Sequence, residues 1–250
     1  EQPVDTDSKG DFTIDERALE PAEFMAFTTF NPRSFEKFWR PWQPTGPLVF
    51  AELPAEAQNA LLAELAKVVD FELGELFVNG VLGAGANQLF NGILTRIAAD
   101  ADVILADAPV AITQANVIDA LKKVRVKIPK AVRKQKNLKI FMSVEDADLY
   151  DDALTAQASK GKDHTEKNPE RFKGIPIVAL ASWPKDIVVA ANASMDLDTN
   201  FWAGIGFSDD MEAIKIDRLT NAGEKYFFKM LMKADTQTAF GEEIVLYKPV

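Results

Sequence analysis

The chain has 250 residues, 47% of them hydrophobic and 26% charged, which is typical of a folded protein rather than a disordered one. Its formal net charge of −10 argues against a protein whose main task is to grip nucleic acid, because such proteins gather Lys and Arg against the phosphates. It has no cysteine and a single histidine, His164, so disulfides, thiolate metal sites and most histidine-based catalytic schemes are excluded. Because there is no membrane-spanning apolar run and no signal-peptide pattern at the start, we expect a soluble protein that is not secreted.

Residues 12–50 are rich in both aromatic residues and prolines. Nine of the 24 aromatic residues lie here among five prolines. These aromatics are Phe12, Phe24, Phe27, Phe30, Phe35, Phe38, Trp39, Trp42 and Phe50. Prolines at this density break helices and interrupt strand ladders, while the aromatic rings require burial. We therefore expect the segment to lie extended against the rest of the chain or against another subunit.

The segment that follows predicts one long amphipathic helix. Pro54 suits a first helical turn, and apolar residues recur at three- and four-residue steps. They are Leu62, Leu65, Val69, Leu73 and Leu76. About 25 residues give a helix of roughly 37 Å. Asn79 and Gly80 are expected to end it with a left-handed backbone.

The rest of the chain predicts a mixture of helices and strands. Expected helices cover 113–124 and 145–157, and expected strands cover 102–112, 137–143, two parts of 174–193 around Pro184, 214–216, 225–233 and 243–250. Thr113 is the expected cap of the first helix, and Ser143 with Asp146 has the spacing of a capping box at the second. A polar stretch over 159–172 is expected to be an exposed loop.

Residues 79–94 read NGVLGAGANQLFNGIL, a glycine-rich stretch that could suggest a phosphate loop. A Walker loop needs Lys and then Ser or Thr after its last glycine, but Gly92 is followed by Ile93 and Leu94. A dinucleotide loop follows a strand, whereas this stretch follows a predicted helix. Phosphate binding is therefore not expected here.

Asp196, Asp198 and Asn200 have the spacing that starts a calcium-binding loop. The position that needs glycine is Phe201, and the position that needs a bidentate Glu is Phe207, so an EF-hand is excluded. A looser cation site stays open, but we expect no catalytic residue, no cofactor and no metal.

The segment 122–139 gathers nine basic residues and no acidic one. In an acidic protein such a segment favours a solvated face that pairs with acidic neighbours.

Three passages resemble the major capsid proteins of tailed bacteriophages with the Hong Kong 97-type shell fold. The helix that runs into ELFVNGVLGAGANQLFNGIL is similar to the family's spine helix and its glycine-rich passage. Residues 139–194 are similar to the family's strand, helix, variable loop and following strand and turn. Residues 209–250 resemble its returning strands and final strand, so the resemblance covers roughly residues 54–250.

The resemblance implies an α+β fold with a fixed order of segments. The order is an N-terminal arm and extended loop (1–50), a peripheral domain with the spine helix (51–88), an axial domain (89–195), the returning strands of the peripheral domain (196–240) and the final strand of the axial domain (241–250). Gly80, Gly83, Gly85 and Gly92 would form the passage between the two domains, where close backbone approach and unusual dihedrals are needed.

The resemblance further implies a structural protein, not an enzyme, that self-assembles into hexamers and pentamers of an icosahedral shell around double-stranded DNA. Its partners would be copies of itself, with portal, scaffolding protein and maturation protease during assembly, and packaged DNA bound non-specifically; no membrane is involved. It would reside in the virion, after assembly in the cytoplasm of the host bacterium. The first residue is Glu1, so we expect a chain that is either processed or trimmed, and the resemblance implies a precursor segment removed by the maturation protease.

The expected subunit-interface residues are Phe24, Phe27, Phe30, Phe35, Phe38, Trp39, Trp42, Lys134 and Lys136. We expect the basic segment to pair with acidic surfaces of adjacent subunits within a capsomer. Two alternatives stay open. One is an encapsulin, a bacterial compartment with the same fold around a cargo enzyme, and the other is a soluble α/β enzyme that uses carboxylates alone.

Overall fold

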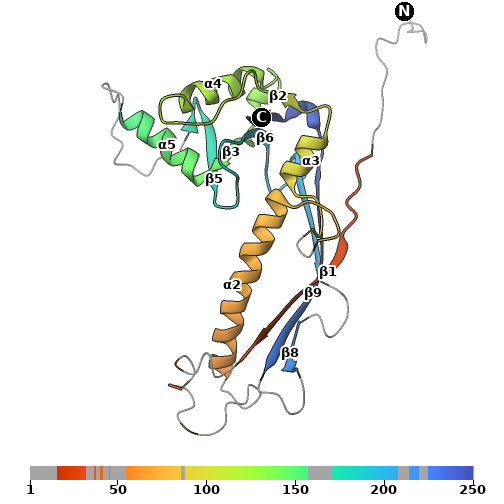
Figure 1. Cartoon of the computed structure of the whole chain (residues 1–250). Coiled ribbons are helices and arrows are strands. Elements are labelled where there is room, and N and C mark those ends of the chain that lie inside the picture. Colours follow the sequence, from red (N-terminus) through yellow and green to blue (C-terminus); the bar gives the residue numbers. More distant parts are fainter. Residues whose placement is uncertain are drawn as a thin grey trace, which may run out of the picture.

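The structure is a computed structural model that describes residues 16–31, 37, 40–41, 45, 55–85, 88–156, 171–207, 214–219 and 225–249. Within these residues the chain forms two β-sheets, and a long helix lies beside one of them (Figure 1). Both helices and strands occur along the chain, so the expected mixture of α and β structure is confirmed. No helix in this part of the chain is both long and apolar enough to cross a membrane.

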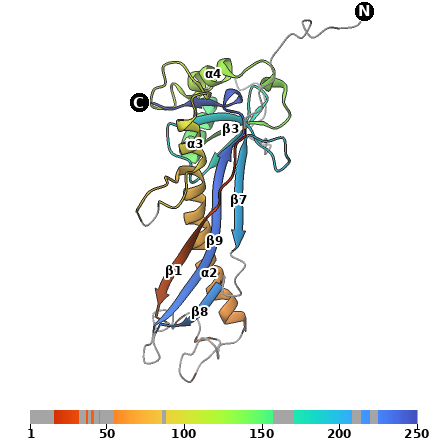
Figure 2. The same cartoon turned by 90° about the vertical axis from the view of Figure 1, so that its right-hand side faces the viewer.

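One sheet has four strands and is built around β9 (Tyr226–Thr238). β1 (Ala22–Phe30) pairs antiparallel with one edge of β9, while β7 (Phe201–Phe207) and β8 (Ile214–Arg218) share the other edge (Figure 2). Phe24, Phe27 and Phe30 of the arm therefore lie on an extended strand that pairs with their own chain, which is one of the two expected arrangements.

The long helix, α2 (Ala55–Asn79), has 25 residues and confirms the expected length. It runs alongside the β9 sheet (Figures 1 and 2). The helix ends at Gly80, whose N–H donates to the carbonyl of Leu76 at 2.8 Å. The expected left-handed stop is wrong, because Gly174 alone among the described glycines has a positive φ. The helix ends where its last turn meets the backbone of Gly92.

The second sheet has six strands in the order β2-β10-β6-β3-β5-β4. They are β2 (Ile104–Leu105), β3 (Leu138–Ser143), β4 (Arg171–Phe172), β5 (Ile175–Leu180), β6 (Val188–Asn192) and β10 (Val245–Tyr247). The pairs β2–β10 and β3–β5 are parallel and the other pairs are antiparallel.

The structure adds detail to two expected features of this sheet. Within 102–112, which is expected as strand and extended chain, only the two residues of β2 are strand, because Ala108 turns the chain with a φ of 40° and Pro109 has no amide donor. The two strands on either side of Pro184, β5 and β6, are not paired with each other, since β3 lies between them.

Helices cover both faces of the six-stranded sheet. α4 (Val117–Lys127) and α5 (Val144–Thr155) pack on one face, and α3 (Ile93–Ala99) on the other. In β6, Val188 and Ala190 belong to the first core, whereas Val189 and Ala191 belong to the second. Successive side chains of a strand point to opposite faces, so a strand buried on both faces is apolar throughout.

The helix caps were predicted in part. Ser143 caps α5, accepting a hydrogen bond from the N–H of Asp146 at 3.0 Å, as expected. The Asp146 carboxylate, however, accepts from the N–H of Asp186 at 2.9 Å and so links the start of α5 to the β5–β6 connection. Thr113 is not the cap of α4; Asn116 occupies that position, and its side chain accepts from the Thr113 N–H at 2.8 Å in the preceding turn.

The segment before β1 is tied to distant parts of the chain by charged side chains. Arg17 forms an ion pair with Asp100 at 2.6 Å. Asp235, on β9, accepts from the N–H of Glu20 and from Arg96, each at 3.0 Å. The Arg17 hydrogen bond lowers the pKa of Asp100 below its ordinary value. The start of the described chain is therefore fixed where α3 and β9 meet.

Candidate assembly surfaces

Phe90 joins the long helix to the first strand. Its ring is 2% exposed and lies between Phe77 of α2, at a centroid distance of 5.3 Å, and Phe24 of β1, at 6.0 Å. Offset and tilted rings at such distances attract one another beyond the area that they bury. The predicted interface residue Phe24 thus also holds its own subunit together.

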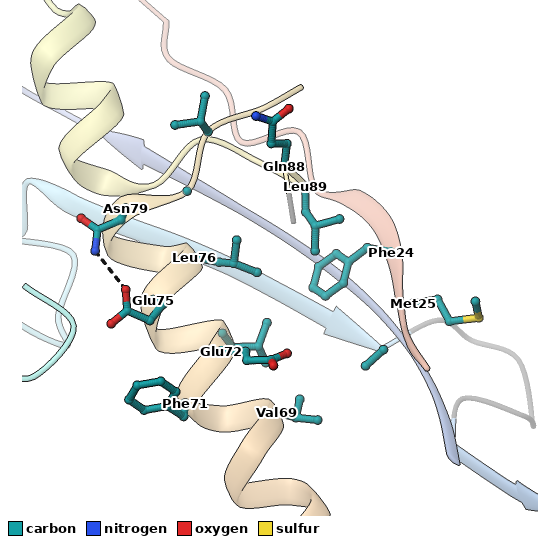
Figure 3. Close-up of a pocket in the computed structure, with 14 residues that line it drawn as sticks. Phe24, Met25, Val69, Phe71, Glu72, Glu75, Leu76, Asn79, Gln88 and Leu89 are labelled. Atoms are coloured by element: carbon teal, nitrogen blue, oxygen red, sulfur yellow. Dashed lines mark hydrogen bonds between the residues drawn. The ribbon is translucent and has the colours of Figure 1, made fainter. Parts of the chain in front are cut away.

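An open groove lies between α2 and β1, beside this aromatic contact (Figure 3). We call it the α2–β1 groove, and its volume is about 500 Å³. Its lining residues are Phe24, Met25, Ala26, Val69, Phe71, Glu72, Leu73, Glu75, Leu76, Asn79, Gly80, Val81, Gln88 and Leu89. Leu76 and Phe24 point toward each other across it, whereas Met25 points away from the helix. The groove is apolar with two carboxylates, which suits side chains of another protein better than a small anion.

Large apolar side chains around the groove remain exposed. Met25 and Phe27 on β1 are each 51% exposed, and Phe71 on α2 is 62% exposed. Phe27 stacks on Phe227 at a centroid distance of 5.9 Å. Met25 and Phe27 share the face of β1 that points away from α2, and exposed apolar residues that share a face are typical of a protein–protein contact.

The predicted aromatic interface residues differ in their availability. Phe30 is 8% exposed and stacks on Tyr226 at 6.0 Å, so little of its ring is left for another subunit. Phe24 is half-buried and Phe27 is exposed. The other four, Phe35, Phe38, Trp39 and Trp42, lie outside the described residues, as does His164.

The four glycines of the predicted passage have unequal roles. A Cβ on Gly92 would lie 2.6 Å from the Gly80 nitrogen and 2.7 Å from the Leu76 oxygen, so these backbones meet at a distance that only glycine permits. The nearest atoms that a Cβ on Gly83 or Gly85 would meet belong to the side chain of Gln88. The expected close approach is thus found at Gly80 and Gly92, but the unusual dihedrals are not, because neither residue has a positive φ.

Part of the basic segment is satisfied within the chain. Lys122 pairs with Asp119 at 2.7 Å, and Lys127 pairs with Asp107 at 2.8 Å. Arg133 donates to the carbonyls of Val126 and Ile128 at the end of α4. Cations there complement the helix dipole, so these residues have a structural role.

Three lysines of the same segment are left over. Lys130, Lys134 and Lys136 are exposed, and none of them has an ion pair with a residue in the described part of the chain. We call these three residues the basic patch. It includes both lysines that the sequence analysis selected.

The remaining polar motif does not form a cation cage. Asp198 accepts a hydrogen bond from Asn192 at 2.9 Å, whereas Asn200 is buried and donates to Glu243 at 3.2 Å. Across the described residues no three His, Cys, Asp or Glu side chains gather as a metal ion would require.

No family model matches the chain, and no curated protein sequence is similar to it. Solved structures are similar. A chain of the satellite phage P4 procapsid with size determination (Sid) protein gives a TM-score of 0.59 at 12% identity, over 100% of this chain and 85% of that one. The capsid of the empty GTA particle gives 0.55 at 15% identity, over 96% and 78%. Gordonia phage Cozz gives 0.51 at 10% identity, over 99% and 78%.

These likenesses define the fold as that of phage capsid proteins, the Hong Kong 97-type capsid fold that the sequence resemblance implied. The likeness extends along the whole chain rather than over one sheet.

Proposed function

We propose that this chain is the major capsid protein of a tailed bacteriophage, and that its copies self-assemble into the hexamers and pentamers of an icosahedral shell around double-stranded DNA. The observation that carries the proposal is the capsid-type fold over 100% of the chain. In this proposal the chain has no catalytic role, and it resides in the virion after assembly in the host cytoplasm.

Exposed apolar side chains on β1 and α2 support self-association. Met25, Phe27 and Phe71 are more exposed than a chain that works alone requires. We propose that the aromatic arm of a neighbouring copy, with Phe35, Phe38, Trp39 and Trp42, covers such surfaces. A thin shell gains buried area per subunit in this way.

The domain assignment belongs to the same proposal. Residues 51–88 and 196–240 would form the peripheral domain, and 89–195 with 241–250 the axial domain. The net charge of −10 suits a container that holds DNA without binding it tightly. Portal, scaffolding protein and maturation protease would act during assembly.

The test is cryo-electron microscopy of the purified chain, with absorbance at 260 and 280 nm measured on the same particles. Icosahedral shells that contain nucleic acid are the expected result. Shells filled with a co-purifying enzyme would indicate an encapsulin instead of a phage capsid protein. A monodisperse monomer under all conditions, with turnover of a small substrate, would overturn the proposal in favour of an enzyme.

A further inference from the structure

Resting on the proposed function, we infer that neighbouring copies join through a charged contact, in which the basic patch of one copy meets an acidic face of α5 on the next. The acidic face consists of Glu145, Asp148, Asp151 and Asp152.

The basic patch is held in a defined position. Lys134 belongs to the short helix η4 (Val132–Lys134), and Lys130 and Lys136 flank it. Val132 is buried in the core, and η4 packs against β3. Three exposed ammonium groups are therefore carried by a fixed turn rather than by a long loop.

The acidic face is unfavourable for the isolated chain. Asp148 and Asp152 are four residues apart on α5, so their like charges repel. Asp151 and Asp152 lie near the C-terminal end of the helix, where negative charge opposes the helix dipole, and no basic residue occupies the last turn. Glu145 approaches Lys185 at 3.7 Å, and no other member of the face pairs with a described cation. A cationic partner would relieve this repulsion.

The two surfaces lie at opposite ends of one strand. The basic patch precedes β3 and the acidic face follows it, and a six-residue strand spans about 20 Å. Lys136 is two residues before the start of β3 and Glu145 is two residues after its end. This separation prevents pairing within a copy but suits a head-to-tail contact, the kind that closes into rings.

Charge complementarity also answers a problem of assembly. Copies that each carry a net charge of −10 repel one another, and a contact between opposite charges offsets this repulsion locally. Because exposed charges are screened by salt, the contact predicts that the shell forms less readily as the NaCl concentration rises.

The test uses the full-length chain in four forms besides wild type. The basic-reversed variant is Lys134→Glu with Lys136→Glu, and the acid-reversed variant is Asp148→Lys with Asp152→Lys. A third variant combines all four changes and restores the net charge. The control is Lys67→Glu with Lys122→Glu, which matches the first variant in charge but changes lysines that pair with Glu64 and Asp119 of their own chain. Circular dichroism establishes that each is folded, and light scattering with negative-stain microscopy measures the concentration needed for assembly.

Each single-sided variant is expected to raise that concentration by about tenfold or more, while the combined variant and the control remain close to wild type. An equal mixture of the two single-sided variants is expected to assemble at a lower concentration than either variant alone, which places the partners on different copies. Normal assembly of both single-sided variants, or a mixture that assembles no more readily than either variant alone, would overturn the inference.

Normal shells that lose only nucleic acid in the basic-reversed variant would overturn it too, and would assign the patch to nucleic acid. If the wild-type chain itself never assembles, the proposed function fails. If all variants assemble like wild type, only the inferred charged contact fails.

Discussion

Gly80 and Gly92 are in direct backbone contact where α2 ends and α3 begins. The N–H of Gly92 donates to the Gly80 carbonyl at 2.8 Å, and the hydroxyl of Thr95 donates to the same oxygen at 2.7 Å. Because neither glycine has a side chain, their backbones can approach closely and fix the junction between the long helix and the six-stranded sheet.

Gly92→Ala is expected to destabilise the chain by about 1–3 kcal/mol, because the new methyl group meets backbone atoms that cannot rotate away. Gly85→Ala is the matched control, since its Cβ would approach only the side chain of Gln88, at 3.2 Å. Urea unfolding followed by circular dichroism measures the difference. Equal stabilities of the two variants would contradict the close contact.

Tyr247→Phe is expected to loosen the loop that follows β2. The buried hydroxyl donates to the Val110 carbonyl at 2.8 Å and accepts from its N–H at 2.9 Å. Removal of the hydroxyl leaves both backbone groups without their partner, at a cost of about 1–3 kcal/mol. Hydrogen exchange should accelerate at Val110 and remain slow in β3; uniform acceleration would mean that the hydroxyl has no local role.

Arg17→Met is expected to lower stability by about 0.5–1 kcal/mol at neutral pH, since the ion pair with Asp100 is only partly buried. The folded-state pKa of Asp100 is lowered, so its contribution is present above the ordinary Asp pKa of about 3.8 and is lost as pH falls through the lowered folded pKa. The gap between variant and wild type should therefore shrink in acid. A stability difference between variant and wild type that stays constant from neutral to acid pH would show that Arg17 does not act through the Asp100 carboxylate.

Asp146→Asn is expected to change the pH dependence in the opposite direction. Burial raises the pKa of Asp146, so the native state favours the proton, and this favourable contribution is lost as pH rises through the raised folded pKa. Asparagine keeps an oxygen for the Asp186 N–H but carries no charge. The variant should gain stability relative to wild type as pH rises from acid toward neutral, measured by urea unfolding at each pH. A flat difference would show that the burial of this carboxylate is not costly.

Local patterns predicted much of the fold, and long-range pairing was missed. The periodicity of α2, the apolar run of β3 and the Ser143 cap each depend on neighbouring residues, so the sequence shows them directly. α3 and β7 were missed because each has only seven residues, and a glycine before α3 and the glycines within β7 weaken the sequence pattern. Both elements pack against β9, a contact that the local sequence does not show. No sequence signal joins Arg17 to Asp100, or Glu20 to Asp235, across separations of 83 and 215 residues.

The candidate surfaces followed the same division. The excess of basic residues over 122–139 was visible in the sequence, but which of them were unpaired depended on the fold, because Asp107 and Asp119 neutralise Lys127 and Lys122. The α2–β1 groove could not be foreseen, since its walls come from two separate elements, both of which contact Phe90. The sequence could suggest which side chains were available for contact, and the fold decided which remained exposed.

Met25→Glu and Phe71→Glu are expected to block assembly without unfolding the subunit. Both side chains are more than half exposed at the α2–β1 groove, so the charge costs the isolated subunit less than about 0.5 kcal/mol. A neighbouring copy that covers either side chain would have to bury the new carboxylate, and assembly should fall about tenfold or more in light scattering. Leu197→Glu is the control, because Leu197 is 85% exposed and is not part of the groove. Normal shells from both groove variants would show that this apolar surface faces solvent in the assembled particle.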